Sequence, residues 1–427
     1  MPMTPQRRAF LARLAALPAV LGGAGALAAP VLSETSHGLS FARASRANAW
    51  LEIDAAGFER NIAELRKLLE PQTRVCAVLK ADAYGHGLDL LMPSILRSGI
   101  GCIGICSNEE ARIARLRGFR GRIVRLRTAT LEEVEDGVPR QVEELVGNAN
   151  YAQDLARIAQ RRGRRLRVHF ALNSTGMDRN GLELGTDEGK DDARRILALA
   201  PLQVVGIMSH FPVEEAGDMR AGNARFAADT DWVIAAGRLQ RKALTVHVAN
   251  SYATLNVPES RLDMVRTGGA LFGDTDPAFR QFQRIMTFKS RVATVNHYPA
   301  GSTVAYDRTY KLARDSWLAN IPVGYSDGYR RTLSHANQPE ADQTQAYVLV
   351  RGRRLPVVGR VTMNTVMADA TELRDEIRID DEVVLFGRQG DEEITQDSLE
   401  GVARTIGPDL YTVWGNSLPK VLKPAHG

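Results

Sequence analysis

Short apolar segments alternate with amphipathic stretches along the first two thirds of the chain. The apolar segments have the length and β-branched composition of buried strands, and helical patterns lie between most of them. This alternation predicts parallel βαβ units, and eight such strands favour a (β/α)8 barrel, an α/β fold. The expected barrel strands are 74–80, 101–106, 122–128, 141–146, 166–173, 204–210, 245–250 and 264–273.

The pattern changes near residue 287. Before it, the segment "AWLEIDAAGFERNIAELRKLLEP" predicts a short strand and an amphipathic helix with Ile62, Leu65 and Leu69 on one face. After it, β-rich pieces are joined by Gly, Pro and Asp. We therefore expect a barrel domain over 48–287 and a mostly β domain over 288–427.

The first 28 residues have a basic start, an apolar middle, and small residues at Ala26 and Ala28. That layout predicts a secretory signal, with 29–47 as a linker. Arg7-Arg8 resembles a twin-arginine signal, and an ordinary Sec signal with two chance arginines is the alternative. Either route predicts a periplasmic protein.

Charge gives little support for a polyanionic partner. The 427 residues carry a formal charge of +5, but the predicted signal holds three arginines and no acid. Its removal leaves 52 basic against 50 acidic residues. We therefore expect no nucleic-acid partner. We also expect no metal site and, since no apolar run in the body could span a bilayer, no membrane anchor.

The three cysteines are Cys76, Cys102 and Cys106. Cys76 lies four residues before Lys80, and Cys102 lies four before Cys106. If their strands are parallel neighbours of similar register, Cys76 and Cys102 face each other with matched parity. An exported protein would then contain a Cys76–Cys102 disulfide. Three reduced thiols are the alternative.

Chemistry in a (β/α)8 barrel sits at the C-terminal ends of the strands. Lys80 follows one apolar strand directly, in "AVLKADAYGHG" (77–87). Arginine, asparagine and histidine side chains end several of the other strands. The strand ends together carry Lys80, Arg127, Asn173, His210, Asn250, Ser251 and Arg266.

The segment "AVLKADAYGHG" is similar to the cofactor-lysine signature of alanine racemases, pyridoxal-phosphate enzymes with a barrel followed by a β domain. The resemblance runs from about Trp50 to the C-terminus. Seven further motifs match in the family's order: "STGMDRNG" (174–181), "SHF" (209–211), "HVANSYATL" (247–255), "VRTGGALFG" (265–273), "VAYDRTY" (304–310), "PVGYSDGYRR" (322–331) and "GRVTMN" (359–364).

This resemblance implies a cofactor site. Lys80 would bind the aldehyde of pyridoxal 5'-phosphate through its amine. Arg266 would face the ring nitrogen, with His210 orienting Arg266 and His247 orienting a catalytic tyrosine. The remaining implied contacts are a phosphate cradle of Tyr84, Ser251, Gly268, Gly269 and Tyr325, and a hydrogen bond from Arg179 to the phenolic oxygen.

Racemisation needs a base on each face of the substrate Cα. The resemblance implies Lys80 as one base and Tyr306, in "VAYD", as the other. Tyr306 would reach the barrel from a partner subunit, so a homodimer with composite sites is expected. The amide of Met363 would bind the substrate carboxylate, beside Arg179.

Several positions depart from the dedicated alanine racemases. Ala171, Leu172 and Asn173 stand where those enzymes carry a lysine, and a chloride ion beside Asn173 could replace its carbamate. Asn416 stands in place of a tyrosine that narrows the substrate entrance. Further departures are Asn364 for an aspartate and the presence of Arg125, Arg127 and Pro212.

Together these features are similar to broad-spectrum amino-acid racemases of the bacterial periplasm. They imply a racemase that interconverts L- and D-amino acids, basic ones included. A dedicated, exported alanine racemase is the first alternative. A decarboxylase is disfavoured by Arg266, where such enzymes place a glutamate. A cofactor carrier is disfavoured because it would lack the β domain and need no Tyr306.

Overall fold

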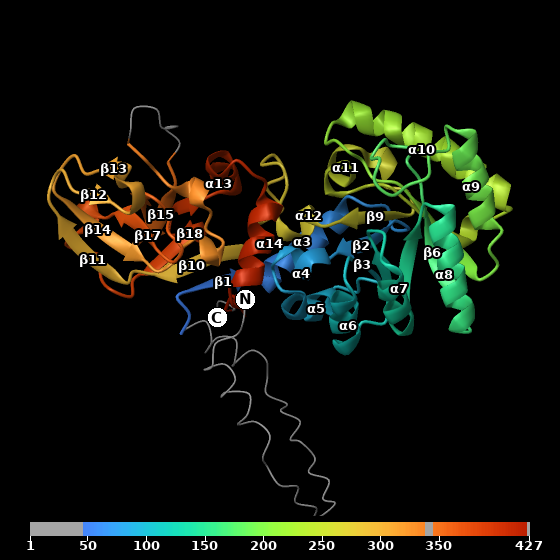
Figure 1. The fold of residues 1–427 in the computed structure, drawn as a ribbon, viewed down its shortest axis with the longest axis horizontal. Helices are drawn as coiled ribbons and strands as arrows, with labels where there is room; N and C mark the ends of the chain where they lie inside the picture. The colour runs from blue at the N-terminus through green and yellow to red at the C-terminus, as the bar shows by residue number, and fades with distance from the viewer. Residues whose placement is uncertain (1–45, 338–344, 425–427) are drawn as a thin grey trace, which may run out of the picture.

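The computed structural model describes residues 46–337 and 345–424. They form a barrel and a mostly β domain, with the last long helix between them (Figure 1). The signal predicted for residues 1–28 lies outside the described residues.

The eight predicted barrel strands are all present, so the (β/α)8 prediction is confirmed. Each hydrogen-bonds its neighbour in parallel, in the order β8-β7-β6-β5-β4-β3-β2-β9. The Arg266 amide donates to the Ala249 carbonyl at 2.9 Å, which joins the two ends of the sheet. The strands are β2 (Arg74–Val78), β3 (Cys102–Ile105), β4 (Arg122–Arg125), β5 (Val142–Val146), β6 (Leu166–Ala171), β7 (Leu202–Met208), β8 (Thr245–His247) and β9 (Met264–Thr267).

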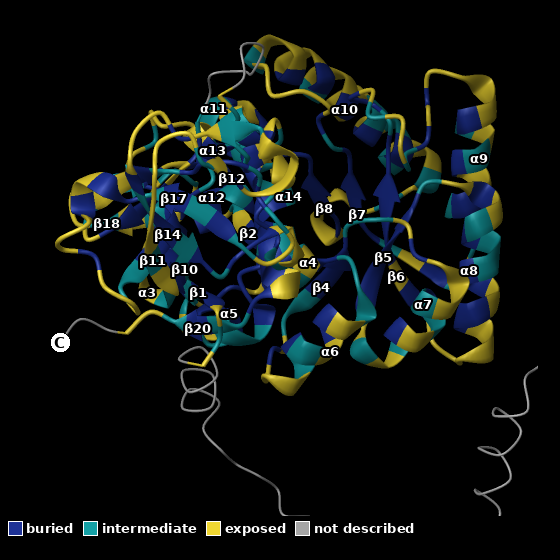
Figure 2. Ribbon diagram, turned by 60° about the vertical axis from the view of Figure 1, so that its left-hand side comes forward, coloured by how far each residue is buried: buried dark blue, intermediate teal, exposed yellow. Residues whose placement is uncertain are grey.

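Amphipathic helices cover the outside of the barrel, and the strands beneath them are buried (Figure 2). Ser107 and Thr130 begin two of the helices with capping boxes, which satisfy the first free N–H groups. No helix in the described ranges is long and apolar enough to cross a membrane. The helices are α3 (Ala55–Lys67), α5 (Leu88–Arg97), α6 (Asn108–Leu116), α7 (Leu131–Gly137), α8 (Ala149–Arg161), α9 (Asp187–Leu197), α10 (Ala216–Gly237), α11 (Ser251–Asn256) and α12 (Gly269–Phe272).

In its described residues, the β domain contains two main sheets and two α-helices. The larger sheet has the order β16-β15-β18-β10-β1-β20, where β1 is Ala49–Ile53, and β11, β14 and β17 form the smaller one. Its elements are β10 (Met286–Arg291), β11 (Thr294–Tyr298), β12 (Thr303–Val304), β13 (Tyr310–Lys311), β14 (Ser316–Ile321), β15 (Tyr347–Val350), β16 (Arg353–Pro356), β17 (Val366–Asp369), β18 (Glu382–Gln389), β19 (Glu392–Ile394), α13 (Gln396–Ala403), α14 (Gly407–Ser417) and β20 (Lys420–Leu422).

Strand β1 (Ala49–Ile53) corrects the predicted domain border, which placed it with the barrel. It pairs antiparallel with β10 and parallel with β20, both in the β domain. Its side chains Leu51 and Ile53 are fully buried there. The apolar run correctly predicted a strand, but periodicity does not say which sheet a strand joins.

Candidate active site

A cavity of about 630 Å³ lies at the C-terminal ends of the barrel strands. Its walls come from the ends of β2, β7 and β9 and from the loops after β6 and β8. The structure brings eight of the predicted cofactor residues together here: Lys80, Tyr84, Arg179, His210, Ser251, Arg266, Gly268 and Gly269.

Lys80 begins a short helical turn, α4 (Lys80–Tyr84), with an unusual backbone. The next four residues, 81–84, all have φ of 54–55°, the left-handed region that residues with a Cβ rarely adopt. Asp82 holds this turn, since its carboxylate accepts from the Leu88 amide at 2.7 Å and pairs with Lys420 at 2.9 Å. At Gly85, also left-handed, a Cβ would overlap the carbonyl oxygen of Tyr411 in α14. The β domain therefore helps to fix the lysine-bearing turn.

Hydrogen-bond donors converge beside this turn, as a phosphate requires. The Ser251 hydroxyl accepts from the amides of Gly268 and Ala270, both at 3.1 Å. A Cβ on Gly268 would lie 2.5 Å from the Tyr84 hydroxyl, so only glycine fits there. Burial, followed by the negative charge of Asp274, raises the pKa of Tyr84, which stays a protonated donor. This cradle fits a phosphate group.

Arg266 lies buried at the base of the cavity. Its Nη1 donates to Nδ1 and the carbonyl of His247, at 2.7 and 3.0 Å. Its Nη2 donates to the carbonyls of Ser209 and Val248, at 2.8 and 3.1 Å. Burial lowers the pKa of Arg266 to about 10, which still leaves it charged at neutral pH. Nε–H donates to no group in the described part of the chain, so it is free for a ring nitrogen.

Comparison with known proteins agrees with this geometry. The sequence profile of the alanine racemase N-terminal domain matches residues 53–276, and that of the C-terminal domain matches 285–422. The chain belongs to the alanine racemase family. It is thus a racemase of a family that uses pyridoxal phosphate, and the residues above fit that cofactor.

Individual relatives extend the match over almost the whole chain. A broad specificity amino-acid racemase of Pseudomonas putida is 51% identical, over 98% of this chain and 99% of its own. A lysine racemase of Proteus mirabilis is 45% identical, over 88% and 89%. Among solved structures, the alanine racemase of Streptomyces coelicolor superimposes with a TM-score of 0.79 at 29% identity, covering 88% of this chain and 98% of its own.

Of the two histidines of the racemase site, only His210 makes the contact predicted for it, with Arg266. His247 is fully buried, and its Nε2 lies 2.8 Å from Nδ1 of His169. Both of its nitrogens are therefore used, and the prediction that it orients a catalytic tyrosine is wrong. His210 lines the cavity, 3.4 Å from Arg266. Burial, assisted by Arg266, lowers the pKa of His210 to about 3, so it faces the cavity as a neutral ring.

Three predicted residues lie in the β domain, outside the barrel cavity of their own chain. Tyr306, Met363 and Tyr325 are 67%, 54% and 45% exposed. Tyr306 follows β12 and lines a separate cavity of about 450 Å³. One chain alone therefore does not bring Tyr306 to Lys80, and its role as second base stays a prediction.

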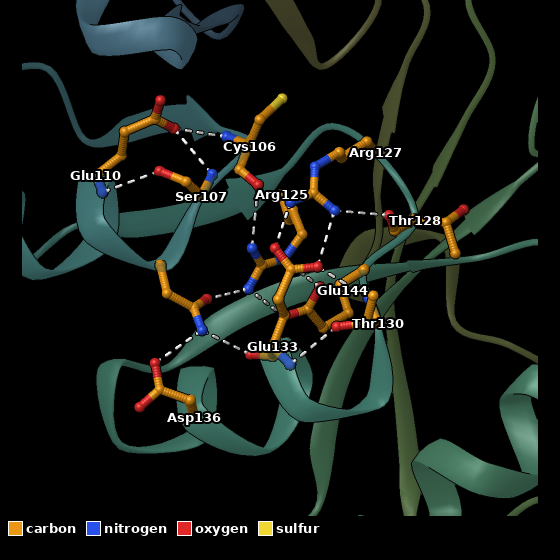
Figure 3. Close-up of polar contacts among 12 residues, drawn as sticks. Cys106, Ser107, Glu110, Arg125, Arg127, Thr128, Thr130, Glu133, Asp136 and Glu144 are labelled. Atoms are coloured by element: carbon orange, nitrogen blue, oxygen red, sulfur yellow. Dashed lines mark hydrogen bonds and ion pairs between the residues drawn. The ribbon is translucent and has the colours of Figure 1, made fainter. Parts of the chain in front are cut away.

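Arg125 corrects one specificity prediction (Figure 3). It is fully buried, and its guanidinium binds the Glu144 carboxylate at 2.8 and 3.2 Å and Asn108 at 2.6 Å. Arg127 pairs with Glu133, also outside the cavity. The side chain of Arg125 therefore holds the barrel wall and cannot select a substrate.

The other specificity positions lie around the site rather than in it. Ala171 is buried, and Pro212 is exposed. The Asn173 amide donates to the carboxylates of Asp178 and Glu183, at 2.6 and 3.0 Å. Asn364 donates to Ser326 at 2.9 Å. None of these four lines the cavity.

The prediction that Asn416 widens the substrate entrance stays a prediction, because Asn416 does not reach the cavity of its own chain. Asn416 is exposed on α14 and lies outside the cavity lining. Ile406 and Pro408, at the start of the same helix, line it instead. Helical rotation between positions 408 and 416 decides which residue faces the cavity of the same chain.

Sequence reasoning missed an acidic outer wall. These carboxylates come from the loop after β7, the loop after α12 and helix α13, and no motif contains them. Desolvation, with Asp274 nearby, raises the pKa of Glu214. The members are Glu214, Asp274, Asp276, Asp397 and Glu400. Their clustering in the cavity could be seen only once the two domains were placed together.

The predicted register of the cysteines is confirmed. Cys76 and Cys102 are direct partners on the parallel strands β2 and β3, and both are buried. They are free thiols in this structure. Contact with Cys102, followed by burial, raises the pKa of Cys76. The disulfide itself stays a prediction.

Proposed function

We propose that this racemase acts on a broad range of amino acids, with basic ones among its best substrates. The acidic outer wall carries the proposal, because five carboxylates around a cavity of about 630 Å³ suit a cationic side chain. The names of the relatives from Pseudomonas putida and Proteus mirabilis support the same conclusion.

Proton transfer is assigned to two residues. Pyridoxal phosphate, when bound, withdraws electrons from the substrate Cα and so makes its proton removable. Lys80 lies in the cavity and moves the proton on one face. Tyr306 of the partner moves it on the other, and neutral His210 can accept a hydrogen bond from that tyrosine. Arg266 keeps its own proton and so leaves the ring nitrogen unprotonated, which disfavours side reactions.

The assembly we propose is a homodimer with two composite sites. The exposure of Tyr306 and Met363, both outside the barrel cavity of their own chain, supports it. Mixing inactive Lys80→Ala and Tyr306→Phe proteins tests it, because mixed dimers regain one intact site. Recovery of activity on mixing is expected. Two variants that stay inactive after subunit exchange would place Tyr306 elsewhere.

Export to the periplasm is also part of the proposal, on the basis of the N-terminal basic and apolar segments. In that compartment Cys76 and Cys102 would be oxidised. A chloride ion beside Asn173 remains the proposed substitute for a carbamate, although it would have to displace Asp178 or Glu183 from the amide. Bromide exchange followed by anomalous diffraction would locate it.

The experiment that tests the substrate proposal is deuterium exchange at Cα in D2O, followed by chiral analysis. The panel is L-alanine, serine, methionine, lysine and arginine, with Lys80→Ala as the control. Exchange and inversion across the panel, basic members included, is expected. Inversion of alanine alone would overturn the proposed breadth and establish the dedicated enzyme.

A further inference from the structure

A buried chain of side chains runs from Arg266 through the inside of the barrel, away from the cavity. Nε2 of His247 lies 2.8 Å from Nδ1 of His169, and Nε2 of His169 lies 2.8 Å from the Glu143 carboxylate. His169 and His247 are fully buried, and Glu143 is almost so. At the far end Arg122 and Arg167 both pair with Glu143, at 2.7 and 2.8 Å. The cofactor arginine is thus connected to a carboxylate at the other end of the barrel.

The direction of these hydrogen bonds is determined at both ends. An arginine only donates, so Nδ1 of His247 must accept from it. His247 then carries its proton on Nε2 and donates to Nδ1 of His169. His169 in turn carries its proton on Nε2 and donates to the carboxylate of Glu143. With both rings neutral, no other arrangement satisfies these three contacts. Nη2 of Arg122, 3.4 Å from Nε2 of His169, then donates to Glu143 instead, at 2.7 Å.

Both rings are held neutral by their surroundings. Burial lowers the pKa of His169 and of His247, and the charge of Arg266 lowers that of His247 further. The arrangement therefore leaves a guanidinium at one end, a carboxylate at the other, and two polarised imidazoles between them. Such a chain strengthens each of its members.

The barrel makes room for this chain at one position. His169 on β6 has to pass strand β7 to reach His247 on β8. Its register partner on β7 is Gly206, and the strand register shifts beside it. A Cβ on Gly206 would overlap Nδ1 of His169. A side chain there would close the path between the two histidines.

We propose that His169 and Glu143 are positioning residues that hold Arg266 against the cofactor ring, acting through His247. Arg266 has no carboxylate partner of its own among its hydrogen bonds in the described residues. Glu143 supplies the negative charge, and the two imidazoles transmit it. The proposal rests on the racemase site described above and adds two residues that do not line its cavity.

The first test is the protonation of the histidines in cofactor-free protein labelled with [15N]histidine. His169→Gln assigns the His169 resonances by their loss. Neutral rings protonated at Nε2, for both His169 and His247, are expected. A proton on Nδ1 of His247, or a doubly protonated ring at either position, would overturn the proposal. This readout does not depend on catalysis or on substrate range.

The second test compares His169→Leu with His169→Gln in the holoenzyme. Leucine breaks the chain, whereas glutamine can still accept from His247 and donate to Glu143. We expect His169→Leu to lower kcat by about tenfold to a hundredfold, the usual range for an outer hydrogen-bond partner. KM should change little, the absorption of the bound cofactor should shift, and His169→Gln should restore both kcat and absorption.

The control is Glu144→Gln. It weakens an equally buried carboxylate–guanidinium pair one residue away, with Arg125, on the outer side of the same strand. We expect it to lower stability but to leave kcat and cofactor absorption unchanged. If Glu144→Gln and His169→Leu alter absorption alike, or if His169→Gln fails to restore it, the residues have only a structural role.

Discussion

Acid should destabilise this protein well above the pH at which carboxylates titrate. Burial lowers the pKa of His86 to about 4 and that of His210 to about 3. His169 and His247 shift in the same direction. In the unfolded chain each histidine returns to a pKa of about 6.5. Between these values the unfolded state binds more protons, so stability is lost as pH falls below about 6.5.

The size of the effect follows from these values. Between pH 7 and pH 5, a histidine that changes its pKa from about 6.5 to 4 or below costs about 2 kcal/mol. His86 and His210 together therefore account for about 4 kcal/mol, and the two inner histidines add to it. Burial raises the pKa of Glu143, but its hydrogen bonds with His169 and Arg122 outweigh burial and lower that pKa. The contribution of Glu143 to stability is therefore lost only as the pH falls below about 4.3, the ordinary pKa of a glutamate. The window from pH 7 to pH 5 thus reports on histidines.

The assay is equilibrium urea unfolding of the cofactor-free protein at pH 7, 6 and 5, followed by circular dichroism. His86→Gln is the informative variant, because glutamine can also donate to the carbonyls of Ala83 and Tyr84, which His86 Nδ1 contacts at 3.0 and 2.9 Å. Between pH 7 and pH 5, His86→Gln should lose about 2 kcal/mol less of its free energy of unfolding than the unsubstituted protein loses. Equal stability at pH 7 and pH 5, or an unchanged slope in His86→Gln, would refute the reasoning.

Three other predictions concern single positions. If Cys76 and Cys102 form a disulfide, protein matured under oxidising conditions should expose one alkylatable thiol, Cys106, after unfolding. Cys102→Ser should then lose about 3.5 kcal/mol of stability, which is the loop-closure value for residues 76–102. Three alkylated thiols would show that no disulfide forms. Pro408→Tyr should place a ring in the cavity and lower kcat/KM for lysine at least about tenfold more than for alanine, measured by chiral chromatography; equal losses would remove Pro408 from the specificity argument. Gly85→Ala should cost more than about 1 kcal/mol and weaken pyridoxal phosphate binding in an absorbance titration, because it overlaps Tyr411; wild-type binding would show that the turn relaxes freely.

Strand pattern and motif order were enough to predict the barrel, the β domain and most of the cofactor cavity. The hydrophobic pattern of a strand depends only on neighbouring residues, so each barrel strand could be predicted from its own segment. The C-terminal ends of the parallel strands of a barrel lie at the same face, so Lys80, Ser251 and Arg266 converge as expected. Parity also predicted that Cys76 would face Cys102.

The failures share a physical cause. Arg125 is the last residue of β4, and its side chain points outward to Glu144. Successive side chains of a strand point to opposite faces, so the residue at which the strand ends decides which side chain faces the cavity. Asn416 and Pro408 lie on one short helix, and only its docking angle decides that Pro408 faces the cavity. His169 and Glu143 lie on adjacent strands, and the alternation of side chains along each strand could have placed both inside the barrel. The sequence alone does not show that Gly206 leaves the space through which His169 reaches His247.

The contact between the Lys80 turn and α14 makes the position of the reactive lysine depend on the β domain. The left-handed residues 81–84 lead into Gly85, whose backbone lies against Tyr411 of α14, and β1 pairs with β20. The barrel strands pair with one another without α14, whereas the turn that carries Lys80 is packed against it. Loss of the packing of α14 would therefore disturb the chemistry of the site before it disturbed the barrel.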